Sequence, residues 1–145
     1  MSVSFRILSL NISEKKGEQK KPVPSMELKP AHGIVGDAHA GNWHRQISLL
    51  ADEDVDTIRG RGMELNFGDF AENITTRGVD LGVLPIGTRI RMGEAELEVT
   101  QIGKECHQNC AVFRVVGDCV MPRKGIFAKV ITGGTITVES KCHVL

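Results

Sequence analysis

The sequence has few aromatic residues and no excess of charge. Its 145 residues include five Phe, one Trp and no Tyr, and 18 basic side chains balance 18 acidic ones. Nucleic-acid-binding proteins usually carry a basic excess and often stack bases on aromatic rings, so we do not expect nucleic acid as the main partner. The apolar and charged fractions, 41% and 25%, are those of an average globular protein and exclude disorder as the main state.

Long apolar runs are also absent. No segment approaches the roughly 18 consecutive apolar residues of a membrane-spanning helix, so no membrane partner is expected. Arg6 interrupts the N-terminal apolar run, which therefore does not resemble a secretory signal and indicates a cytoplasmic protein. At this length we expect one domain over residues 1–145. The four cysteines of a cytoplasmic chain are expected to be free, reactive or metal-bound.

The hydrophobic pattern predicts mainly strands. Apolar residues alternate over 3–12 but change phase near Ile7 and Leu8, which predicts a bulge or a sharp bend. Residues 11–22 have no apolar period and are expected to form an exposed loop. Short strands that do not alternate with helices predict an all-β barrel with one or two short helices. The expected elements are a hairpin over 89–100 that turns at Gly93-Glu94, a helix over 51–61, and strands over 46–50, 112–116, 126–131 and 135–138.

Residues 32–46 form the first segment with concentrated polar chemistry. They contain three His, one Asp, one Arg and the single Trp of the chain. Asp37, His39 and His44 are candidate metal ligands, although their spacing matches no recognised site. The alternative is a structured loop whose polar side chains bond to its own backbone.

Residues 68–78 form the second such segment. It offers carboxylates, an amide and a guanidinium from Asp69, Glu72, Asn73 and Arg77. These groups suit an anionic small molecule, because arginine can donate two N–H groups to one phosphate. A turn with surface charges that leads into a strand is an equally good interpretation.

The third segment holds three of the four cysteines, Cys106, Cys110 and Cys119. Their spacing permits a zinc site but lacks paired Cys-x2-Cys knuckles. A reactive thiol is a second interpretation, because basic neighbours lower a thiol pKa. The candidate neighbours are Lys104, His107, Arg123 and Lys124. Burial of the three cysteines as small apolar residues is the third interpretation, and Cys142 near the end of the chain is expected to be incidental.

In this order, the three segments resemble the MOSC domain, named for the C-terminal domain of molybdenum-cofactor sulfurase. The similarity covers essentially the whole chain, as in a short stand-alone bacterial protein, and implies a bent, closed β-barrel of the pyruvate-kinase-barrel type. The family's cysteine follows a Val-x-Gln strand, so Val99-Thr100-Gln101 implies that it is Cys106; Glu105 replaces the proline that precedes this cysteine in many relatives. The matching residues are 13–21, 32–39, 45–50, 68–74, 81–82 and 97–106.

The resemblance implies one of two chemistries. In the first, Cys106 carries sulfur as a persulfide, with Cys110 and His107 as possible catalytic helpers, which would make the protein a sulfur transferase. In the second, Cys106 is a metal ligand to molybdenum, as in the amidoxime-reducing relatives. The residues that would then bind the molybdenum cofactor (molybdopterin) are Arg45, Asp69, Asn73, Arg77, Lys104 and Arg123.

The partners implied are a pyridoxal-phosphate-dependent cysteine desulfurase and molybdopterin-biosynthesis proteins. No tightly bound pyridoxal phosphate is expected in this chain itself. Because the chain is shorter than the reductase relatives, sulfur carriage or cofactor binding is favoured over a complete molybdenum reductase. A zinc-stabilised, non-catalytic binding module that uses Cys106, Cys110 and Cys119 is the alternative from another class.

Overall fold

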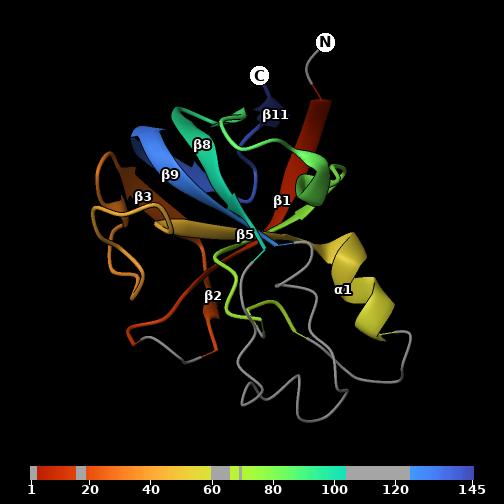
Figure 1. The fold of residues 1–145 in the computed structure, drawn as a ribbon. Helices are drawn as coiled ribbons and strands as arrows, with labels where there is room; N and C mark the ends of the chain where they lie inside the picture. Colours follow the sequence, from red (N-terminus) through yellow and green to blue (C-terminus); the bar gives the residue numbers. More distant parts are fainter. Residues whose placement is uncertain (1–2, 16–18, 60–65, 69, 104–124) are drawn as a thin grey trace.

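Seven strands of the computed structural model close into a β-barrel, which confirms the mostly β prediction (Figure 1). The structure describes residues 3–15, 19–59, 66–68, 70–103 and 125–145. β1 pairs with β11 and so closes the ring. Around the barrel the strands are β11 (Cys142–Val144), β7 (Arg89–Met92), β8 (Ala95–Ile102), β9 (Ile126–Thr132), β5 (Ile47–Ala51), β6 (Ile74–Arg77) and β1 (Val3–Ile12).

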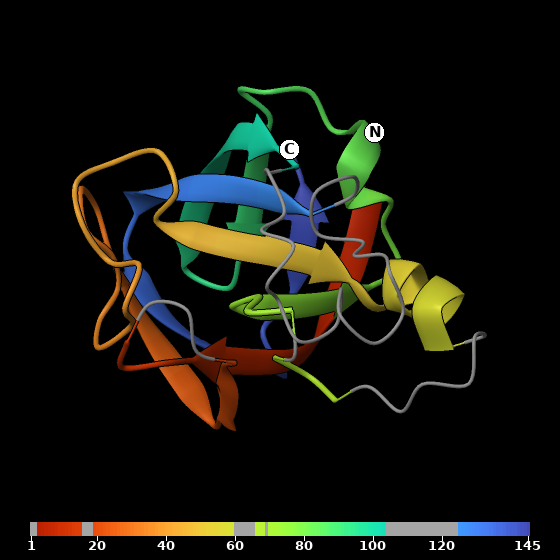
Figure 2. The ribbon, with the colours of Figure 1, turned by 60° about the horizontal axis from the view of Figure 1, so that its bottom comes forward.

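The remaining elements lie outside this ring. β2 (Lys21–Val23) pairs with the end of β1, and a second sheet contains β10 (Gly134–Thr137), β3 (Ser25–Lys29) and β4 (Gly33–Ile34). α1 (Asp52–Arg59) follows β5 directly, and a short 3-10 turn, η1, covers Leu81–Val83. Figure 2 shows α1 and the β3 sheet on opposite sides of the barrel. No helix among the described residues has both the length and the apolar character needed to cross a membrane.

Local sequence explains the best-defined elements. The register of β1 against β6 shifts between Ile7 and Ser9, which confirms the predicted bulge. β7 and β8 form the predicted hairpin, and Gly93 turns it with a φ of 57°, where a side chain is disfavoured. Apolar residues of β8 point into the barrel core and its glutamates pair outside with Arg89, as the alternation requires.

The predicted exposed loop over residues 11–22 is wrong at several positions. β1 continues to Ile12 and β2 begins at Lys21. Asn11, Ser13 and Lys20 are buried because each bonds to a segment far away in the sequence. The predicted strand over 112–116 lies outside the described residues, and β3, β4 and β11 were not expected. Cys142, which was expected to be incidental to the chemistry, is a buried core residue of the closing strand β11.

Candidate functional site

The ends of β8 and β9 form the base of the segment that carries the three clustered cysteines. The backbone N–H of Gly103, just after β8, donates to the carbonyl of Gly125, just before β9, at 2.6 Å. The two described residues that flank 104–124 are therefore bonded to each other at one point of the barrel rim. The predicted site residues Lys104, Cys106, His107, Cys110 and Arg123 belong to this segment and lie outside the described residues, as does Asp69.

Gln101 connects this base to the histidine-rich segment 32–46. Its side-chain oxygen accepts from Arg45 Nε and from His44 Nε2, each at 3.0 Å. Its Nε2 donates to the carbonyl of Gly103 at 2.7 Å. These bonds fix the amide orientation of Gln101 and form a continuous link from residues 44–45 to the residue that precedes the undescribed segment.

Arg45 is a described cation whose side chain is held in place and can bind an anion. Its guanidinium carbon lies 5.2 Å from the ring centre of Phe127 in β9. Among the described residues, no carboxylate lies within ion-pair distance of Arg45. Because Nε is used by Gln101, the two terminal nitrogens of the guanidinium are the groups that can meet an incoming anion.

Asn73 joins the second predicted segment to the same end of the barrel. Its Oδ1 accepts from the backbone N–H of Ser48 at 3.0 Å and from the Ser48 hydroxyl at 3.1 Å. Its Nδ2 donates to the carbonyl of Asn11 at 3.1 Å. Ser48 pairs across the sheet with Phe127, whose ring lies under Arg45. The amide of Asn73 is fully buried and connects β1 to β5, so its contacts in this structure are internal ones.

Glu72 is a buried carboxylate next to Asn73. One oxygen accepts from the backbone N–H of Phe70 at 3.2 Å and the other from the hydroxyl of Thr75 at 2.9 Å. Burial raises the pKa of Glu72, and the hydrogen bonds to Glu72 oppose that rise only in part. No described cation pairs with it. The sequence had suggested that the Glu72 carboxylate could accept hydrogen bonds from a ligand. In the structure this carboxylate is enclosed by the protein.

Arg77 lies at the opposite end of β6 from Asn73. Its Nη2 donates to Asp52 Oδ2 at 2.7 Å and to Asp56 Oδ2 at 3.1 Å, which fastens α1 to the barrel. The hydrogen bond to Asp52 raises the pKa of this guanidinium. The structure thus brings Arg45 and Asn73 to one end of the barrel and leaves Arg77 beside α1.

A buried ion pair between Lys20 and Asp37 is the main feature that the sequence did not reveal. The Lys20 ammonium donates to Asp37 Oδ1 at 2.8 Å, Ser13 Oγ at 3.1 Å and His39 Nδ1 at 3.0 Å, and neither charged side chain is exposed. Burial alone would raise the pKa of Asp37, but the hydrogen bonds from His39 and Lys20 hold it well below the usual range. Lys20 stands in a run of charged residues, where a lysine is usually solvated, so no local signal marked it.

This ion pair also argues against the interpretation of residues 32–46 as a metal site. The Lys20 ammonium lies between Asp37 and His39, where a metal ion would be repelled, and His44 donates to Gln101. No group of three His, Cys, Asp or Glu side chains in the described part of the chain could hold a metal ion. Because an ammonium only donates, His39 Nδ1 is the acceptor in its hydrogen bond with Lys20.

Comparison with known proteins gives the family. The YuaD protein from Bacillus subtilis has a TM-score of 0.83 and 21% identity, over 99% of this chain and 97% of that one. YiiM from Geobacillus stearothermophilus has a TM-score of 0.74 and 20% identity, over 97% of this chain and 75% of that one. YiiM from Escherichia coli has a TM-score of 0.68 and 17% identity, over 98% of this chain and 69% of that one. No curated protein matches the sequence. The MOSC domain family model matches residues 36–143, and the chain therefore belongs to the MOSC domain family.

Proposed function

We propose that this MOSC protein serves molybdenum-cofactor metabolism by carrying sulfur on Cys106. The observation that supports the proposal most is the link from Arg45 and His44 through Gln101 to Gly103. This link fixes the backbone at Gly103, three residues before Cys106 in the sequence. A transfer site needs such a fixed attachment point, because misplacement of a reacting atom slows a reaction sharply.

The transfer step is a thiol exchange that leaves the sulfur oxidation level of the pair unchanged. The Cys106 thiolate attacks the outer sulfur of a persulfide on the cysteine of a pyridoxal-phosphate-dependent desulfurase. A new S–S bond forms on Cys106 as the S–S bond of the donor breaks, and the donor cysteine leaves as a thiolate. A second thiol, such as Cys110, can then attack the Cys106 sulfur, form a disulfide with it and release the outer sulfur as hydrosulfide to a metal–sulfur acceptor.

Arg45 supports this chemistry through its charge. It places a cation at the base of residues 104–124 that no described carboxylate neutralises. Positive charge near a thiol favours its thiolate form, which is the nucleophile in exchange. The same cation favours the approach of an anionic donor persulfide.

The second candidate function is binding of the molybdenum cofactor. The terminal nitrogens of Arg45 suit the phosphate of such a group, and Cys106 would be the metal ligand by family resemblance. Within the described residues the fit depends on Arg45, because Asn73 and Arg77 are engaged by the protein itself. When bound, the cofactor would supply redox chemistry, and this chain would hold and orient it.

Sulfur loading tests the leading proposal directly. The full chain is incubated with a cysteine desulfurase and L-cysteine, and its intact mass is measured without reductant. We expect the wild type and Cys142→Ser to gain one sulfur and Cys106→Ser to gain none. Equal gain by Cys106→Ser would contradict the proposal. One zinc per chain that is lost only on unfolding would favour the zinc-stabilised module instead.

Molybdopterin that copurifies from a host able to make it tests the second candidate. We expect Arg45→Gln to lose most of the bound molybdopterin and Arg77→Gln to retain it, because Arg77 lies beside α1. The two variants remove the same charge, so they are matched controls for each other. Equal retention by both would show that Arg45 does not hold the cofactor.

A further inference from the structure

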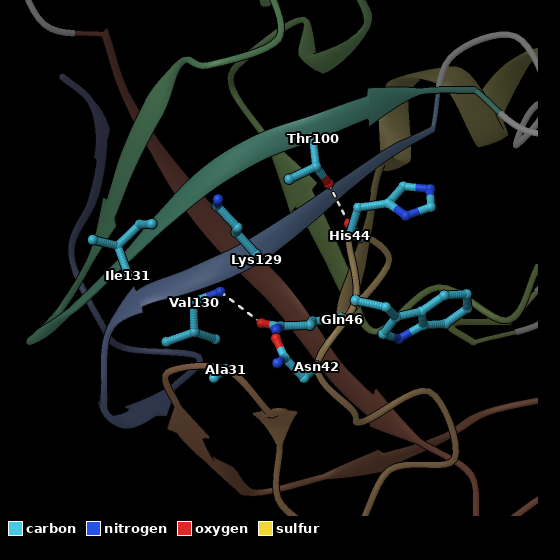
Figure 3. Close-up of a pocket in the computed structure, with 9 residues that line it drawn as sticks. Ala31, Asn42, His44, Gln46, Thr100, Lys129, Val130 and Ile131 are labelled. Carbon is cyan, nitrogen blue, oxygen red and sulfur yellow. Dashed lines mark hydrogen bonds between the residues drawn. The ribbon is translucent and has the colours of Figure 1, made fainter.

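We propose that a pocket on β9 binds a small, uncharged, planar aromatic molecule with a carbonyl or carboxamide group. The pocket, here called the β9 pocket, has a volume of about 430 Å³, which is within the range of small-molecule sites. Figure 3 shows residues of β9, of Thr100 in β8 and of segment 42–46 around it. The proposal does not depend on Cys106 or on the proposed transfer.

Gln46 is a preorganised hydrogen-bond donor in this pocket. Its Oε1 accepts from the backbone N–H of Val130 at 2.9 Å, as Figure 3 shows, so its amide orientation is fixed with Nε2 as the donor. The side chain is held against Gly33, where a Cβ would come within 3.0 Å of Gln46 Cβ. Gln46 is only 2% exposed, and no described residue accepts from its Nε2. A ligand acceptor would satisfy this donor.

Trp43 provides an aromatic wall whose orientation is also fixed. Its indole N–H donates to the carbonyl of His39 at 2.8 Å, and its backbone N–H donates to Gly41 at 3.0 Å. The residue nevertheless remains 38% exposed and lines the pocket. A held aromatic ring with an exposed surface favours a planar aromatic partner, because ring pairs gain more than their buried area alone.

The charge and polarity of the pocket select the ligand class. The Lys129 ammonium lies 3.4 Å from Glu98 Oε2, so it is held by a carboxylate that it shares with Arg89. Asn42 adds a second amide beside Gln46 (Figure 3), and Val130 and Ile131 are apolar. Amide donors next to aromatic and apolar walls suit an uncharged ring with a carbonyl better than a carboxylate or a phosphate.

The single Trp of the chain makes the pocket directly observable, because all tryptophan fluorescence comes from Trp43. The full chain is titrated with nicotinamide or benzamide, and with cyclohexanecarboxamide as a non-planar control. Trp43 emission and the NMR signal of its indole N–H are followed together. We expect saturable changes in both signals for the aromatic amides and at least tenfold weaker binding of the control. Linear quenching without movement of the indole signal would overturn the proposal.

Variants locate the binding. We expect Asn42→Ala to weaken nicotinamide binding about tenfold, the loss typical of one hydrogen bond. Gln46→Glu keeps an oxygen that accepts from the Val130 N–H and removes the Nε2 donor, so it should weaken nicotinamide binding at least as much. If this variant does not fold, the binding measured for Asn42→Ala tests the site. Thr135→Ala, an exposed substitution on β10, is the matched control and should leave binding unchanged. Equal affinity for Asn42→Ala and Thr135→Ala would overturn the proposed site.

Discussion

Arg45 donates its Nε–H to the side-chain oxygen of Gln101 at 3.0 Å, although the two residues are 56 positions apart. The same Gln101 donates to the carbonyl of Gly103, the last described residue before the cysteine segment. One amide therefore joins the arginine of the first predicted segment to the base of the third. In the proposed transfer Gln101 is a positioning residue, because it acts on Cys106 through the backbone.

Replacing Gln101 by leucine should slow sulfur loading more than it lowers stability. Gln101 is half-buried, so we expect a loss of about 1 kcal/mol or less in the free energy of unfolding. Loss of the bond to Gly103 should slow single-turnover loading of Cys106 by about tenfold or more. Gln19→Leu, at an exposed position, is the matched control. Equal loading rates for the two variants would show that Gln101 has no positioning role.

Removing one partner of the Lys20–Asp37 pair should destabilise the fold strongly. Lys20→Met leaves a buried carboxylate without its cation, which typically costs about 3–5 kcal/mol in the free energy of unfolding. Adding Asp37→Asn to Lys20→Met should cost less than the sum of the single changes, by about 1 kcal/mol or more. Urea unfolding of the four proteins measures this coupling, and strict additivity would contradict it.

The Asp37 single variant adds a pH test. The pKa of Asp37 is lowered in the folded protein, so its contribution to stability is present above the ordinary carboxyl pKa and is lost as pH falls toward the folded value. Asp37→Asn should therefore lose less stability than the wild type does on acidification below pH about 4. The same steepness in both proteins would mean that Asp37 does not titrate in this way.

Glu72 should give the opposite pH dependence. Its pKa is raised in the folded protein, so the folded state holds a proton that the unfolded state has released. The free energy of unfolding should then fall as pH rises from the ordinary glutamate pKa to the folded value, by at most about 1.4 kcal/mol per pH unit. Glu72→Gln should remove this decline. Unfolding curves at a series of pH values test it, and an unchanged slope in the variant would refute the assignment.

Cys142 should be unreactive in the folded protein. It is buried in the core strand β11, and burial raises its pKa to about 12, so almost none of it is thiolate near neutral pH. Iodoacetamide at pH 8 should modify Cys142 only after denaturation, as peptide mass mapping can show. Labelling of Cys142 in the native protein at the rate of a free thiol would contradict its burial.

Local sequence predicted those parts of the fold in which a short pattern decides the structure. The phase change near Ile7, the glycine at the turn of the β7–β8 hairpin and the acidic first turn of α1 each act within a few residues. β11 has only three residues and no clear pattern. Its strand state depends on pairing with β1 and β7, which a local pattern cannot show.

The sequence predicted which residue types would form the candidate site better than it predicted where their side chains lie. Arg45 was identified and lies at the base of the cysteine segment, but Asn73 and Glu72 looked like ligand-binding groups and are buried in internal hydrogen bonds. Lys20 looked solvated and is enclosed with Asp37. In each case the decisive partner comes from a distant segment, and spacing along the chain carries no information about it.

Mapping the transferred sulfur tests the central claim most directly. After loading by a cysteine desulfurase, the native protein is alkylated, digested and analysed by tandem mass spectrometry, so that each cysteine is read separately. The account predicts that the extra sulfur is found on the peptide of Cys106, with Cys142 unmodified as the internal control. Sulfur on Cys142, or on other cysteines with none on Cys106 at the earliest times, would contradict it.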